Sequence, residues 1–274
     1  MSSCFRSRPV GNKRATAVAL ALLCVLAGRA GPQNAAADDA NWKTFLEWLK
    51  AQPPNSRPAD LINPYRDKLI RDGVAEGEVS RRMEMIWWGC YHRPDGVGLF
   101  WSKIFGGDHP IFTEQPNALL VNAVQGRKPG RALDFGMGQG RNTVFLAMQG
   151  WDVTGFDPAE GAVRIAEKNA AAAGVKIHAV VARDDQFDFG AAQWDLIVVT
   201  YVRDLTARDA AIFQRALKPG GIVVYENGSS PGNEVLKAFL GFRILRFEDV
   251  EAIADWNREE KHPIQRMIAE KIGK

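Results

Sequence analysis

Short apolar segments and helical patterns alternate along the second half of the chain, and this alternation constrains the fold more than any other feature of its 274 residues. Strands are expected at 131–135, 152–157, 177–182, 194–200 and 222–226, with a final strand pair at 243–247 and 264–270. Helices are expected at 142–148, 159–173, 206–217 and 234–240. Strands that alternate with helices form βαβ units. The sequence therefore predicts an α/β fold with a doubly wound, mainly parallel seven-stranded sheet, Rossmann-like, whose ligand lies at the carboxyl ends of the strands.

A glycine-rich loop joins the first strand to its helix in the segment ALDFGMGQGRNT, residues 132–143. Gly136, Gly138 and Gly140 alternate with other residues, which lets the backbone turn tightly and approach a ligand. The dinucleotide fingerprint G-x-G-x-x-G would require a glycine where this chain has Arg141. The pattern G-x-G-x-G therefore disfavours a pyrophosphate cradle.

Two acids flank this loop. Asp134 stands two residues before the first glycine, where a carboxylate repels a diphosphate and attracts an amino group or a sulfonium. Asp157 ends the second strand, 21 residues after Gly136, where an acid can accept hydrogen bonds from both hydroxyls of a ribose. The loop and its acids together favour a cationic nucleoside as the ligand.

Four ordered segments, ALDFGMGQG, VTGFD, QWDLIVV and LKPGGIVV, resemble the motifs of the class I S-adenosylmethionine-dependent methyltransferases. The resemblance runs from about Leu120 to the C-terminus. The version GRNT followed by FLAMQGWDVTGFD is similar to the small-molecule branch that includes the tellurite-resistance and thiopurine-type enzymes.

The resemblance implies S-adenosylmethionine as co-substrate and a cofactor site made of Asp134, Gly136, Met137, Gly138, Gly140, Asn142, Asp157, Pro158, Asp184, Asp185 and Thr200. In such a site Asp134 and the glycine backbone face the methionine part, and Asp157 binds the ribose. Either Asp184 or Asp185 reaches the adenine amino group. Met137 departs from the small residue usual at its position.

Methyl transfer is an in-line displacement that needs orientation and exclusion of water more than an obligatory catalytic residue. Tyr201, after the fourth strand, is the candidate for orienting the acceptor, although it can equally serve core packing.

No metal site is expected, because the four histidines are scattered and Cys90 has no partner at ligand spacing. No G-x-S-x-G segment supports a serine hydrolase.

The remaining chain divides into a leader at 1–37 and a helical, Trp-rich N-terminal cap at 38–115, ahead of the methyltransferase domain at 116–274. Within the cap, WKTFLEWLK at 42–50 predicts an amphipathic helix that packs on the main domain or touches a membrane surface. The aromatic segments at 85–93 and 99–102 either bury the cap or form a lid over the substrate.

The leader holds basic residues followed by a fourteen-residue run at 15–28 that is apolar except for Thr16, as in a signal peptide or short anchor. This run is too short for a comfortable transmembrane helix, and residues 35–37 offer a small-residue cleavage site. Without the leader the chain holds 30 basic and 32 acidic residues, a net charge of −2, which gives no electrostatic argument for nucleic acid. A protein exported or N-terminally anchored by 1–37 is therefore expected, with a cytoplasmic one if the start codon is misassigned.

The function predicted from these features is methyl transfer from S-adenosylmethionine to a small-molecule acceptor. A nicotinamide-dependent oxidoreductase on a similar sheet is the alternative enzyme. A non-catalytic binding protein that retains the fold is the alternative of another class, prompted by export away from the cytosol, where the donor is made. The sequence leaves the acceptor, its reacting atom and the oligomeric state open.

Overall fold

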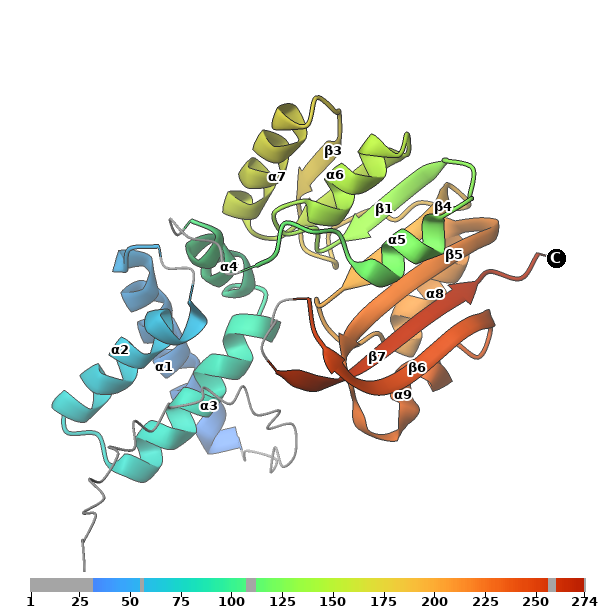
Figure 1. The fold of residues 1–274 in the computed structure, drawn as a ribbon. Coiled ribbons are helices and arrows are strands. Elements are labelled where there is room, and N and C mark those ends of the chain that lie inside the picture. Colours follow the sequence, from blue (N-terminus) through green and yellow to red (C-terminus); the bar gives the residue numbers. More distant parts are fainter. Residues whose placement is uncertain (1–31, 55–56, 107–111, 256–259, 274) are drawn as a thin grey trace, which may run out of the picture.

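A computed structural model describes residues 32–54, 57–106, 112–255 and 260–273. Its centre is a seven-stranded sheet with the order β3-β2-β1-β4-β5-β7-β6 (Figure 1). The strands are β1 (Arg131–Phe135), β2 (Asp152–Asp157), β3 (His178–Val181), β4 (Trp194–Thr200), β5 (Leu217–Gly228), β6 (Arg243–Ile253) and β7 (Lys261–Glu270). The first five are parallel, and β7 runs antiparallel to both β5 and β6. The predicted mainly parallel, doubly wound sheet is confirmed, with its strand order reversing between β1 and β4.

Helices cover both faces of this sheet (Figure 1). One face carries α5 (Ala118–Val124), α6 (Arg141–Met148) and α7 (Glu160–Ala172). The other carries α8 (Ala207–Ala216) and α9 (Glu234–Ala238).

The burial of β4 shows why its sequence is apolar almost throughout. Leu196 and Val198 pack with the α5 and α6 side, whereas Ile197 and Val199 pack with Phe213 on the α8 side. A strand covered on both faces needs an apolar residue at every position.

Three strands, β5, β6 and β7, are longer than the sequence predicts. β5 begins at Leu217, because that residue pairs with Trp194 ahead of the Pro219-Gly-Gly segment that reads as a helix stop. β6 continues to Ile253, because its second half pairs with β7 as far as Lys261. Pairing with a neighbouring strand thus overrides the local signals that indicate a break.

Four N-terminal helices form a second unit beside the sheet (Figure 1). They are α1 (Pro32–Ala51), α2 (Pro58–Arg71), α3 (Glu76–His92) and α4 (Val97–Phe105). Their shared core includes Trp42, Phe45 and Leu49, the apolar stripe expected for the 42–50 helix, together with most of the aromatic side chains of 85–101. That stripe therefore packs among the helices of its own unit. Among the described residues, none of the helices has the length and apolarity that crossing a bilayer requires.

The predicted leader lies for its first 31 residues outside the described part of the chain, while its last six residues belong to α1. The helix continues past the expected cleavage point, and Asp38 and Asp39 make ion pairs with Arg81 and Arg93. These contacts fasten the start of the cap to α3 and the residue after it.

Candidate functional site

The glycine loop lies at the carboxyl end of β1, beside the point where the strand order reverses. Gly136, Gly138 and Gly140 have φ angles of +67°, +54° and +82°, in the left-handed region that favours glycine. A Cβ atom on Gly140 would lie 2.7 Å from the Cβ of Ala166 in α7. The alternation of glycines is therefore a requirement of this backbone path and of its packing on α7.

Asp157 closes the loop from the end of β2. Its Oδ2 accepts a hydrogen bond from the Gly138 N–H at 3.0 Å, and its Oδ1 accepts one from the Ala159 N–H at 2.8 Å. A carboxylate has about four lone-pair positions, so each oxygen keeps one for a further donor. Burial raises the pKa of Asp157 to about 6, although both backbone bonds act to lower it.

Asp134, inside β1, is buried even more completely than Asp157. Its Oδ2 accepts a hydrogen bond from the Thr143 hydroxyl at 2.6 Å. Burial raises its pKa to about 6 as well, and the nearby Arg141 and the Thr143 bond offset only part of that rise. Two buried acids beside one glycine loop make the region attractive to a cation.

The N-terminal unit packs onto this part of the sheet domain through α4. The ring of Phe105 would lie 3.2 Å from a Cβ atom on Gly138, and a Cβ atom on Gly98 would lie 2.7 Å from the carbonyl oxygen of Pro158. Phe105 also packs with Ala159 and Ala162 at the start of α7. The predicted site residue Pro158 is thus in contact range of the cap.

The side chain of Met137, in the glycine loop, is buried. Its side chain packs with Val163 and Ala166 in a small cluster, in space left open by Gly155 of β2. Its N–H donates to the Phe156 carbonyl at 3.0 Å. Its carbonyl accepts the Gly140 N–H at 2.9 Å, so the side chain and both backbone groups of Met137 already have partners within the protein.

The two candidates for adenine recognition already have arginine partners. Asp184 accepts hydrogen bonds from Arg203 at 2.6 and 3.1 Å, and Asp185 accepts two from Arg183 at 2.9 and 3.0 Å. Both acids line a cavity of about 270 Å³ beyond the ends of β3 and β4. The choice between them for adenine stays a prediction.

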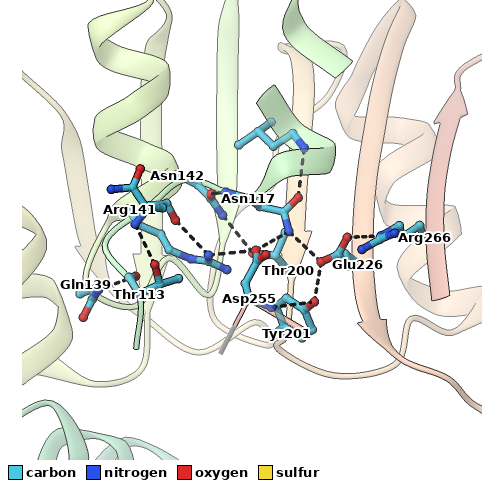
Figure 2. Close-up of polar contacts among 12 residues, drawn as sticks. Thr113, Asn117, Gln139, Arg141, Asn142, Thr200, Tyr201, Glu226, Asp255 and Arg266 are labelled. Carbon is cyan, nitrogen blue, oxygen red and sulfur yellow. Dashed lines mark hydrogen bonds and ion pairs between the residues drawn. The ribbon is translucent and has the colours of Figure 1, made fainter. Parts of the chain in front are cut away.

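A polar cluster occupies the carboxyl ends of β4 and β5, and Figure 2 shows its members converging from distant segments. Asn142 and Thr200, both predicted cofactor contacts, are joined through Asn142 Nδ2 and Thr200 Oγ1 at 3.0 Å. Asn142 Oδ1 also accepts the N–H of Asn117 at 2.9 Å. The structure thus places these two residues on the β4 side of the loop, linked to the residue that caps α5.

Tyr201 adopts an unusual backbone conformation, with a φ of +56°. A non-glycine residue in this region costs on the order of 1 to 3 kcal/mol, which surrounding contacts must offset. Its N–H donates to the Glu226 carbonyl at 2.8 Å and its hydroxyl donates to Glu226 Oε1 at 2.5 Å (Figure 2). Burial and the neighbouring carboxylate raise the pKa of the phenol, so Tyr201 stays protonated at neutral pH.

Glu226 is the buried centre of the cluster. Besides Tyr201 it accepts Asn117 Nδ2 at 2.9 Å and Arg266 Nε at 2.6 Å (Figure 2). Glu226 is not predicted from the sequence as a site residue, although it stands at the end of the fifth predicted strand and the same strand-end rule selects Tyr201. Asn117, Asp255 and Arg266 are not predicted either, because no motif marks them and only the tertiary fold brings them to β4 and β5.

The segment that contains the glycine loop and the first four strands is similar to known proteins. Residues 132–221 match the model of the methyltransferase domain family. The match covers 90 of the 274 residues, about a third of the chain. The predicted resemblance to class I methyltransferases is thereby confirmed for the domain that carries the glycine loop, Asp134 and Asp157.

Individual relatives extend the comparison. A stretch of 121 residues, 40% of this chain, is 31% identical to Ribosomal RNA small subunit methyltransferase C of Alcanivorax borkumensis, and the match spans 37% of that protein's length. An S-adenosylmethionine-dependent methyltransferase from Methanosarcina mazei is 19% identical, with a TM-score of 0.50 over 58% of this chain and all of that one. The [4+2]-cyclase SpnF is 18% identical, with a TM-score of 0.51 over 65% of this chain and 96% of that one. The sheet of the methyltransferase domain is therefore a shared fold, and the chemistry of this chain has to be argued from its own site.

The residues around the loop fit a cationic nucleoside such as S-adenosylmethionine. The carboxylate of Asp157 keeps acceptor capacity for ribose hydroxyls, and the buried Asp134 supplies negative charge. No group of His, Cys, Asp and Glu side chains suited to a metal ion occurs among the residues that the structure describes.

Proposed function

We propose that the protein transfers a methyl group from S-adenosylmethionine to a small-molecule acceptor. The observation that carries the proposal is the loop of three left-handed glycines between two buried acids, Asp134 and Asp157. A pyrophosphate would place two negative charges beside these acids, whereas a sulfonium and an amino group would place positive charge there. The methyltransferase family match to residues 132–221 supports the same donor.

S-adenosylmethionine supplies a methyl group already activated on a positively charged sulfur. The protein then has to hold the donor, exclude water and align the acceptor in line with the bond that breaks. Asp157 would bind the ribose, Asp134 would offset positive charge of the methionine part, and Asp184 or Asp185 would reach the adenine. Tyr201, held by Glu226 on the opposite side of the loop, would orient the acceptor.

The acceptor proposed is a small molecule rather than RNA. The relative from Alcanivorax borkumensis is named for ribosomal RNA, but the chain beyond residue 37 is close to neutral and has no basic run that would follow a phosphate backbone.

We further propose that residues 1–37 direct export or anchor the protein, which separates it from the cytosolic donor pool unless donor reaches that compartment.

The test is isothermal titration of the full chain with S-adenosylmethionine, S-adenosylhomocysteine, NADH and NADPH in parallel. Micromolar binding of the first two with no heat from the dinucleotides is the expected result. Binding of a dinucleotide alone would refute the donor assignment and move the protein to the oxidoreductases. Binding of the donor without methyl transfer to any acceptor in a small-molecule and RNA panel would favour the non-catalytic binding protein.

A further inference from the structure

We propose that Arg141 and Asn117 form a carboxylate-binding site for the methyl acceptor, and that the side chain of Asp255 occupies this site in the present structure. The acceptor would then be a small molecule that carries a carboxylate, which displaces Asp255 when it binds. This inference rests on the proposed function, because it assigns the substrate class of the same site.

The geometry around Asp255 is that of a bound carboxylate (Figure 2). Its Oδ2 accepts a hydrogen bond from Asn117 Nδ2 at 2.7 Å and one from Arg141 Nη1 at 3.0 Å. Its N–H points to the Tyr201 hydroxyl at 3.4 Å. Hydrogen bonds between an arginine and a carboxylate are charge-assisted and stronger than neutral ones, and here an arginine and an amide donate to the same carboxylate oxygen.

Both donors are held in place by bonds that do not involve Asp255. Arg141 Nη1 also donates to the Gln115 carbonyl at 3.1 Å. The Asn117 N–H donates to Asn142, and its side-chain oxygen accepts the Leu120 N–H at 3.0 Å as the cap of α5. Because these bonds remain when Asp255 moves, the site is preorganised for another carboxylate.

The charges of the cluster balance in pairs. Arg266 neutralises Glu226 at 2.6 Å, and Asp255 neutralises Arg141, whose side chain is only 13% exposed. When Asp255 leaves, a largely buried guanidinium stays behind without its counter-ion, which is unfavourable. An incoming carboxylate restores the balance, so exchange of one carboxylate for another costs little.

The position of the site assigns it to the acceptor rather than to the donor. Arg141 and Asn117 meet Asp255 beside Thr200, Tyr201 and Glu226, at the ends of β4 and β5. Most residues proposed for the donor lie at the ends of β1 and β2 or after β3, whereas two of them, Asn142 and Thr200, border the site. A carboxylate held at Arg141 would leave the rest of the acceptor lying between Tyr201 and the glycine loop.

The experiment uses the full chain, with benzoate as the probe and benzamide as its neutral analogue, each titrated calorimetrically. Asp255→Ala, which removes the internal competitor, should bind benzoate at least about tenfold more tightly than the unchanged protein. The reason is that Arg141 and Asn117 are then free to donate to benzoate, and hydrogen bonds between charged groups contribute more than neutral ones. Benzamide affinity should not change. Adding Arg141→Gln to Asp255→Ala should abolish the gain.

Asp38→Asn is the matched control, because Asp38 also forms a partly buried ion pair, with Arg81, but far from the site. It should bind benzoate like the unchanged protein. Asp255→Asn, which keeps the shape of the side chain, guards against misfolding of the alanine variant and should give a smaller gain. No gain in either folded variant would overturn the proposal.

Donor titrations on the same samples separate this proposal from the proposed function. If the unchanged protein does not bind S-adenosylmethionine, the proposed function is refuted. Tighter binding of benzoate by Asp255→Ala would still establish the anion site. If benzoate competes with S-adenosylmethionine but not with its decarboxylated form, the site holds the donor's own carboxylate, and the assignment to the acceptor is wrong.

Discussion

Replacing Asp134 by asparagine tests the central electrostatic argument, because this carboxyl is buried without a cationic hydrogen-bond partner. Asp134 is 1% exposed, and its hydrogen-bond donor is the neutral Thr143 hydroxyl. Burial raises its pKa from 3.8 to about 6. Ionising it in the folded protein therefore costs more than ionising it in the unfolded chain.

The sign of the pH effect follows from that difference. Between pH 4 and pH 6 the folded state binds more protons than the unfolded state, so this group lowers stability as the pH rises. A shift of about two pKa units corresponds to about 3 kcal/mol, fully developed above pH 7. Asp134→Asn removes this penalty, and it also removes the Asp134 charge that raises the pKa of Asp157.

The measurement is urea unfolding followed by circular dichroism at pH 4, 6 and 8. The stability of Asp134→Asn relative to the unchanged protein should improve by about 3 kcal/mol between pH 4 and pH 8. Asp209→Asn is the opposing control, because Arg203 and the Thr206 contacts hold the pKa of Asp209 below its usual value despite burial. That variant should lose stability relative to the unchanged protein as the pH rises. A pH-independent difference for Asp134→Asn would refute the reasoning.

Three further predictions follow from the same geometry. Asp157→Ala should weaken binding of S-adenosylmethionine by about 1.5 to 3 kcal/mol, tenfold or more, and unchanged affinity in a folded variant would remove Asp157 from the ribose site. Gly140→Ala should cost about 1 to 3 kcal/mol more in unfolding free energy than Gly126→Ala, because both glycines have positive φ but only Gly140 faces another side chain at 2.7 Å; equal losses would show that packing on α7 is unimportant. N-terminal analysis of the protein recovered from its native host should find a chain that begins near Asp38, and a mature protein that retains residues 1–37 would argue for an anchor or against cleavage.

The geometry of the glycine loop and its acids, the proposed donor side of the site, was predictable because its determinants are local in sequence. Gly136, Gly138, Gly140 and Asp134 lie within seven residues, and Asp157 follows at the end of the next strand. Each is dictated by a turn or a strand end, which sequence patterns report directly. The strand bounds of β1, β2 and β4 agree with the sequence for the same reason.

The polar cluster at the ends of β4 and β5, the proposed acceptor side, was not predictable, because it is assembled across long separations. Asn117 and Asp255 are 138 residues apart, and Glu226 and Arg266 are 40 apart. Asn117 reads as an ordinary helix cap, and Arg266 as one charged residue of the final strand pair. Their roles depend on β7 entering the sheet beside β5, which periodicity alone does not specify.

The glycine loop carries two buried acids, whereas the cluster at the ends of β4 and β5 carries the largely buried Arg141. This contrast supports a cationic ligand at the first and an anionic ligand at the second. Burial raises the pKa of both Asp134 and Asp157, and the charge of Asp134 adds to the rise at Asp157. A cationic ligand at the loop therefore stabilises their ionised forms and should bind more weakly as the pH falls through about 6. Arg141 has its charge neutralised by Asp255, which an anionic ligand can replace. A cation held on the β1 and β2 side and an anion held on the β4 and β5 side would attract each other across the loop, which favours the close approach that an in-line displacement needs.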